Sequence, residues 1–116
     1  MFSKSMAIIG GSGSLGTALL TALKKTRWKT INIDYRESKL SSKNILLKSG
    51  VNLDYQIDEI TSNLVAFNEE YDAMISVAGE YAGHCSIKDP SFFSAYKTMY
   101  RANVESSLLC IALYKI

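Results

Sequence analysis

Hydrophobic and polar positions follow one another in blocks, and their spacing changes from that of a strand to that of a helix and back. A short apolar run at residues 5–9 predicts a buried strand. Leucines and alanines then recur at helical spacing from Leu15 to Leu23, which predicts a helix of about three turns. Polar and β-branched residues alternate at 29–34 and predict a second strand, and the polar run at 35–43 predicts a loop.

The second half of the chain continues the alternation of short apolar segments with helical patterns. The run at 72–77 is almost uninterrupted in its apolar character, which is typical of a central parallel strand covered on both faces. The elements expected here are a strand at 44–48, a helix at 53–67, a strand at 72–77, a loop at 80–90 and a helix at 91–116 with a break near Tyr100 and Arg101.

Strands that alternate with helices require a parallel sheet with right-handed crossovers. The order β-α-β-β-α-β-α therefore predicts an α/β chain with a Rossmann-type, doubly wound parallel sheet that is incomplete and has about four strands. We expect residues 1–116 to be the N-terminal, nucleotide-binding portion of a single domain of this type.

Composition narrows the class of protein without identifying it. Apolar residues make up 47% of the 116 residues, which predicts a folded core. The net charge of +2 is too small to favour a nucleic-acid partner, and the chain has no apolar run of about 18 residues that would span a membrane. Cys85 and Cys110 lack metal-ligand spacing, so we predict no metal site and reduced thiols in a cytoplasmic protein.

The strongest chemical signal is a glycine-rich stretch directly after the first strand. Gly11, Gly13 and Gly16 fit the pattern G-x-G-x-x-G, with Gly10 immediately before it. Glycines at this spacing let the chain turn sharply, let a pyrophosphate approach the backbone and let the helix pack on the strand. The helix that follows directs its unpaired N–H groups at the phosphates, so this stretch predicts a dinucleotide site.

Asp34 strengthens that prediction, because it ends the second strand about twenty residues after the glycine loop. A carboxylate at this position accepts hydrogen bonds from both ribose hydroxyls and repels a 2′-phosphate, which favours NADH over NADPH. The nearby positive charge of Arg36 softens this discrimination. The alternative role for Asp34 is that of a loop cap.

The stretch Gly10 to Gly16 resembles the cofactor loop of the short-chain dehydrogenase/reductase superfamily, and residues 72–79 resemble its fourth strand. Within this superfamily, the segment Val77-Ala78-Gly79-Glu80-Tyr81-Ala82-Gly83-His84 is similar to the Val-Ala-Gly-Gly-Trp-Ala-Gly segment of the quinonoid dihydropteridine reductases. Met99-Tyr100-Arg101 and the helix after it also match that family, and the likeness runs from about Met6 to the last residue.

The resemblance implies an enzyme that uses NADH, and NADPH less well, to reduce quinonoid dihydrobiopterin to the tetrahydro form. It implies a cytoplasmic homodimer formed through the long last helix, in which Tyr81 lies against the pterin. Asn103 departs from the pattern of that family, which has a small residue there, and agrees with the wider superfamily, in which a helix asparagine supports catalysis. The alternative for Asn103 is an ordinary polar residue on a helix face. It also implies a set of cofactor-binding residues, which comprises Gly10, Gly11, Gly13, Ser14, Leu15, Gly16, Asp34, Tyr35, Ala78 and Gly79.

The superfamily carries out its chemistry with a Tyr-x-x-x-Lys motif that follows the next strand. The chain has this spacing once, at Tyr35 and Lys39, but that pair follows the adenosine-side strand and is far from the expected nicotinamide position. We therefore expect a fragment without the catalytic pair, which is inactive alone and poorly soluble because a strand edge is left unpaired. Four apolar residues of the last helix are expected to be exposed and to pack on a partner subunit: Leu108, Leu109, Ile111 and Leu113.

Two alternatives remain. One is a short-chain reductase of another carbonyl or imine substrate, and the other is a non-catalytic nucleotide-binding module that has lost the catalytic pair. His84, the only histidine, has no carboxylate or metal partner at a suggestive spacing and is expected to be a solvent-exposed loop residue.

Overall fold

Four parallel strands form one sheet in the computed structural model, which describes residues 4–67, 70–81 and 86–114. Their order across the sheet is β3-β2-β1-β4, which confirms the predicted Rossmann-type class. The strands are β1 (Lys4–Ile9), β2 (Trp28–Asp34), β3 (Lys43–Leu46) and β4 (Ala73–Ser76).

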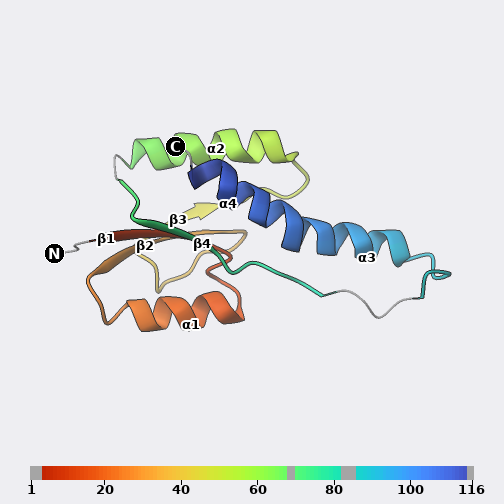
Figure 1. The fold of residues 1–116 in the computed structure, drawn as a ribbon, viewed down its shortest axis with the longest axis horizontal. Coiled ribbons are helices and arrows are strands. Elements are labelled where there is room, and N and C mark those ends of the chain that lie inside the picture. Colours follow the sequence, from red (N-terminus) through yellow and green to blue (C-terminus); the bar gives the residue numbers. More distant parts are fainter. Residues whose placement is uncertain (1–3, 68–69, 82–85, 115–116) are drawn as a thin grey trace.

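Helices cover both faces of the sheet, as Figure 1 shows. Helix α1 (Ser14–Leu23) lies on one face, and α2 (Leu53–Ala66) and α4 (Ser106–Tyr114) lie on the other. Side chains alternate between the two faces of β1, so that Ile8 packs with Leu20 of α1 while Ile9 packs in the cluster that contains Leu64 of α2. The sheet therefore separates two apolar cores.

The strand β4 differs from the expectation of a central strand. Within the described residues it pairs with β1 alone and lies at an edge of the sheet, and each of its residues is half-buried. Both faces nevertheless contact apolar side chains, because Met74 packs against the α2–α4 side and Ile75 packs against the α1 side. The apolar run at 72–77 thus correctly predicts a strand that is covered on both faces, but its central position was wrong, because a strand at an edge can also be covered on both faces.

The last helical region is continuous, with a change of winding at the predicted break. Helix α3 (Phe92–Met99) runs into the π-helical segment η1 (Tyr100–Glu105), which continues into α4. A wide turn of this kind frequently marks a functional site. Figure 1 shows α3 extending beyond the sheet, and neither α3 nor η1 contains a buried residue.

Two of the four apolar residues expected on the outer surface of this helix lie inside. Leu109 and Leu113 are 3% and 2% exposed, because a spacing of four residues places both on the face of α4 that packs against the sheet and α2. Leu108 and Ile111 are exposed, as predicted. His84 and Cys85 lie outside the described residues, and Cys110 is half-buried beside the core, where burial raises the pKa of its thiol. No helix in the described part of the chain is both long enough and apolar enough to cross a membrane.

Candidate functional site

The glycine loop joins the end of β1 to α1 through a tight backbone turn. Gly10 has a φ of +87°, its N–H donates to the carbonyl of Ile33 in β2 at 2.9 Å, and its own carbonyl accepts from the N–H of Gly13 at 3.2 Å. A side chain at Gly16 would collide with the carbonyl oxygen of Gly10 and with the backbone of Gly11. The loop thus folds on itself, and it does so only because these positions lack a Cβ.

Helix α1 begins at this loop without a side-chain cap. Its N-cap residue is Gly13, which has no side chain to bond the first turn. In the described part of the chain, the backbone N–H groups of Ser14 and Leu15 donate to no acceptor. These N–H groups and the positive end of the helix dipole suit an anionic ligand.

The carboxylate of Asp34 lies directly beside this loop at the end of β2. Its Oδ2 accepts the N–H of Ser12 at 2.9 Å, and its Oδ1 accepts the N–H of Tyr35 at 2.6 Å. The guanidinium of Arg36 donates to the carbonyl of Ser12 at 3.3 Å. Asp34, the predicted ribose-binding residue, is therefore joined to the glycine loop by a direct hydrogen bond.

A cavity of about 670 Å³ opens along the carboxyl ends of the strands, where ligands bind in open α/β sheets. It brings together most of the predicted cofactor residues, although their contact with a cofactor remains a prediction. The predicted residues that line it are Gly10, Gly13, Ser14, Leu15, Asp34, Tyr35, Ala78 and Gly79.

Four of the predicted site residues do not line the cavity. Gly11 and Gly16 are buried, and their role is to allow close packing behind the loop. Tyr81 is 71% exposed in the segment after β4, and its contact with a substrate stays a prediction. Asn103 lies in η1 and does not itself line the cavity.

Asn103 instead connects η1 to the chain after β4. Its Nδ2 donates to the carbonyl of Glu80 at 2.8 Å and to the carbonyl of Met99 at 2.9 Å. A Cβ at Gly79 would lie 2.9 Å from Oδ1 of Asn103, so the two segments approach each other closely at this glycine. This contact places the end of β4 and the π-helical turn beside one another at the cavity.

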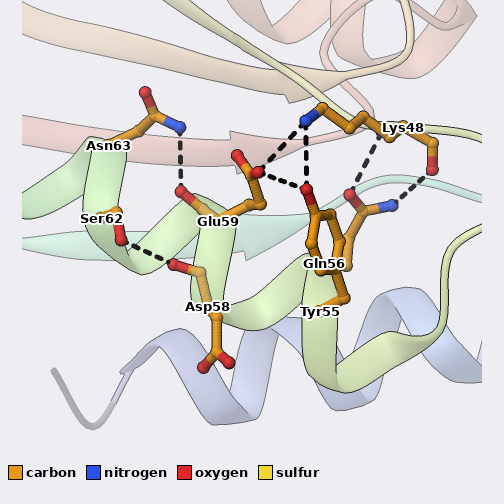
Figure 2. A network of polar contacts seen from close by, with 7 residues as sticks. All are labelled: Lys48, Tyr55, Gln56, Asp58, Glu59, Ser62 and Asn63. Atoms are coloured by element: carbon orange, nitrogen blue, oxygen red, sulfur yellow. Dashed lines mark hydrogen bonds and ion pairs between the residues drawn. The ribbon is translucent and has the colours of Figure 1, made fainter.

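The opposite wall of the cavity, from Leu47 to Gln56, was not predicted from the sequence. The side-chain amide of Gln56 bonds the backbone of Lys48 twice, accepting its N–H at 3.1 Å and donating to its carbonyl at 2.8 Å. Figure 2 shows this pair of hydrogen bonds beside α2. No local sequence pattern predicts the pair, because the two residues are eight positions apart across a loop.

An exposed charged group flanks the same wall (Figure 2). The hydroxyl of Tyr55 donates to Glu59 at 2.7 Å, and the ammonium of Lys48 lies 3.1 Å from the same carboxylate oxygen. The Tyr55 hydrogen bond, followed by that of Lys48, lowers the pKa of Glu59, and the hydrogen bond to Glu59 raises the pKa of Lys48. These groups are exposed, so their contribution to stability is screened by solvent.

The helical region contributes a third wall to the cavity. Arg101 and Glu105 from η1 and Leu109 from α4 line it, although only the glycine loop and the strand ends were predicted to do so. The side chain of Arg101 forms no hydrogen bond or ion pair within the described residues. The π-helical winding, which the sequence indicated only as a break, presents these side chains at the carboxyl ends of the strands.

Fold and site together define a nucleotide-binding α/β protein. The model of the NAD dependent epimerase/dehydratase family matches residues 6–109, which is most of the chain, and the chain belongs to this family. The match includes the glycine loop, Asp34 and the strand end at Gly79.

Among individual relatives, dihydropteridine reductase from Dictyostelium discoideum is 27% identical over 105 residues. That alignment covers 90% of this chain and 44% of the relative, so the chain spans less than half of the relative's length. The resemblance to this family that the sequence motifs indicated is confirmed.

Solved structures show the same fold. A short-chain dehydrogenase from Leptospira borgpetersenii with bound NAD⁺ superposes with a TM-score of 0.76 at 18% identity, covering 99% of this chain and 46% of that protein. A short-chain dehydrogenase family protein from Francisella tularensis gives a TM-score of 0.72 at 22% identity, covering 97% and 46%. The chain therefore carries an incomplete version of the short-chain dehydrogenase fold.

Proposed function

We propose that this chain is the cofactor-binding portion of an NADH-dependent reductase of quinonoid dihydropterins. The observation that carries the proposal is the likeness to a dihydropteridine reductase along 90% of the chain. That relative is more than twice as long as the aligned part, so the activity belongs to the proposal for the whole protein. A cytoplasmic location, as implied by the family resemblance, belongs to the same proposal.

The residues of the loop and the strand ends fit the dinucleotide. The unpartnered N–H groups of Ser14 and Leu15 would bind the pyrophosphate, and Gly16 keeps the loop close to α1. Asp34 would accept the ribose hydroxyls, which favours NADH, and NADPH would bind more weakly. A bound NADH supplies the hydride for the reduction.

The chain's other roles are to orient the cofactor and to hold the substrate-side segment. Ala78 and Gly79 would lie beside the cofactor, and Asn103 keeps that strand end in place through its bond to the carbonyl of Glu80. The exposed ring of Tyr81 would stack on the flat pterin. The proton donor of the reaction would come from a Tyr-x-x-x-Lys motif outside these residues.

A second subunit is part of the proposal. Leu108 and Ile111 remain exposed on α4 after Leu109 and Leu113 have packed into the core. A homodimer through this helix would cover them. The exposed apolar side chains of α3, including Phe93 at 72% exposure, continue the same helical region.

A second candidate is an NAD-dependent enzyme that acts on another carbonyl or imine. It is favoured by the breadth of the matched family, which by its description includes epimerases and dehydratases. It is also favoured by the superposition on a UDP-glucose 4-epimerase, with a TM-score of 0.68 at 15% identity over 97% of this chain and 32% of that protein.

The test measures NADH and NADPH binding by the purified protein, before and after Asp34→Ala. We expect the wild type to bind NADH more tightly and the variant to lose about tenfold of that preference, because one charge-assisted interaction is removed. An unchanged ratio would show that Asp34 does not read the ribose.

Turnover then separates the two candidates. NADH oxidation by the whole protein is measured with a quinonoid dihydropterin and with a panel of simple carbonyl compounds. The proposal expects activity with the dihydropterin alone. Activity with a carbonyl compound and none with the dihydropterin selects the second candidate, and the absence of any nucleotide binding refutes both.

A further inference from the structure

Asn32 is a fully buried polar residue in β2, two residues before Asp34 and beneath the glycine loop. Its side-chain amide lies among acceptors from three segments: Ser12 of the glycine loop, Arg36 after β2 and Asn44 of β3. Buried polar groups of this kind are costly unless they are hydrogen-bonded. The position of these bonds shows what Asn32 holds together.

The direction of the bonds follows from the backbone groups in the network. The N–H of Ser38 can only donate, and it lies 2.8 Å from Asn44, so the atom that receives it is Oδ1. That same oxygen lies 3.0 Å from Asn32, whose facing atom must therefore be the donor Nδ2. The carbonyl of Arg36, 3.2 Å from the same nitrogen, requires the same orientation.

The oxygen of Asn32 faces away from these acceptors. Oδ1 is buried and finds no donor within the described residues, and it lies where a Cβ at Gly11 would collide with it. Gly11 therefore lacks a side chain because Asn32 occupies the space. The glycine loop and the buried amide therefore pack closely, and the Nδ2 of the amide bonds Ser12 of the loop.

Ser12 carries the connection from the buried amide to the cavity. Its Oγ accepts from Asn32 at 3.0 Å and donates to the carbonyl of Arg36 at 2.6 Å. Its N–H donates to Asp34, and its carbonyl accepts from the guanidinium of Arg36. The negative group and the positive group at the end of β2 are thus both bonded to a residue that Asn32 holds.

We propose that Asn32, held in turn by Asn44, is a positioning residue for the ribose end of the cofactor site. It sets Asp34 and Arg36 relative to the glycine loop, and so it controls the preference between a free 2′-hydroxyl and a 2′-phosphate. This inference rests on the proposed nucleotide function. It assigns the preference to a residue that does not itself line the cavity.

The test uses adenosine 5′-monophosphate and adenosine 2′,5′-bisphosphate as probes, with binding measured by calorimetry on the purified protein. The key variant is Asn32→Leu, which keeps the branching and the number of heavy atoms of the side chain and adds no charge. We expect the preference for the monophosphate to fall about fivefold, a change that corresponds to the loss of one net hydrogen bond. Ser12→Ala cuts the same connection at the surface, and we expect it to lower the preference by about threefold.

Thr30→Val is the matched control. Thr30 is 5% exposed on the same strand two residues earlier, and its hydroxyl accepts from the N–H of Ser42, not from the glycine loop. This variant loses a buried polar contact of β2 but should leave the ratio of the two affinities within about twofold. If Asn32 had a purely structural role, Asn32→Leu and Thr30→Val would have the same effect on the ratio of the two affinities.

The outcomes test the positioning role of Asn32 and the proposed nucleotide function separately. A folded Asn32→Leu protein that retains the wild-type ratio overturns the positioning role, as does a Thr30→Val protein that loses the ratio equally. If Asn32→Leu does not fold by circular dichroism, an unchanged ratio in Ser12→Ala overturns it instead. A wild-type protein that binds neither probe refutes the proposed nucleotide function itself.

Discussion

Gly16 provides the sharpest test of the glycine loop, because opposite effects compete when it is replaced by alanine. In the first turn of a helix, alanine is normally favoured over glycine by about 0.5–1 kcal/mol. At Gly16, however, the added Cβ would collide with the carbonyl oxygen of Gly10 and would lie 2.5 Å from the Cα of Gly11. The structure therefore predicts that Gly16→Ala destabilises the protein, against the ordinary preference of a helix.

The magnitude follows from the nature of the colliding atoms. All of the nearest atoms belong to the backbone of the loop, so no side-chain rotation can relieve the contact and the loop must move away from α1. Overpacking of this kind costs about 1–3 kcal/mol, and the helix preference offsets at most about 1 kcal/mol. We expect a net loss of about 1–2 kcal/mol, which lowers Tm by about 5 °C or more.

Gly13→Ala is the matched control within the same loop. An alanine Cβ there would lie 3.5 Å from its nearest neighbour, the carbonyl oxygen of Gly10, which is an ordinary contact. Its φ of −78° is open to any residue, but alanine is a poorer N-cap than glycine, so we expect a loss of no more than about 1 kcal/mol. Because Gly13 lines the cavity, the same variant should weaken NADH binding about tenfold or more.

The assay combines thermal unfolding, followed by circular dichroism, with titration of NADH. Gly16→Ala should lower Tm, whereas Gly13→Ala should mainly lower affinity. A Gly16→Ala protein that is as stable as the wild type would refute the packing of α1 on the loop. A Gly13→Ala protein with unchanged affinity would show that the cavity beside the loop does not hold the dinucleotide.

Three further predictions concern the rest of the chain. Leu109→Ala should lower the free energy of unfolding by about 2–5 kcal/mol because the side chain is buried, whereas Ile111→Ala, at an exposed position, should lower it by less than about 1 kcal/mol. Equal losses in urea denaturation would contradict the assignment of faces on α4. Gln56→Leu should lower stability by about 1–3 kcal/mol because the peptide groups of Lys48 lose their partner, and an unchanged midpoint of urea denaturation would contradict this pairing. The hydroxyl of Tyr55 and the ammonium of Lys48 lower the pKa of Glu59, so the stabilisation from this carboxylate is present above its unfolded pKa and disappears as pH falls through its folded pKa. The Tm of Glu59→Gln should therefore match that of the wild type in acid and lie slightly below it at neutral pH. A difference in Tm that stays constant across the pH titration would count against the ion pair.

The order and type of the elements could be predicted from the sequence because they depend on local pattern. Apolar spacing locates the strands β1 to β4 and the helices α1 and α2 to within a few residues, and the glycine spacing together with Asp34 predicts one site, whose residues line the same cavity. Strand–loop–helix geometry in a parallel sheet brings these positions to the same edge, so a local motif implied a tertiary arrangement. The glycine spacing and the strand end carried this information.

Only the tertiary structure showed which side chains face inward and what the polar ones contact. Leu109 and Leu113 have the same apolar character as Leu108 and Ile111, and the packing of α4 on the sheet decided which pair is buried. Asn32 looked like one polar position in an alternating strand, yet it joins segments whose paths depend on the whole fold. Periodicity specifies a face relative to its own element, whereas the burial of that face and the partners of its polar groups depend on residues distant in the chain.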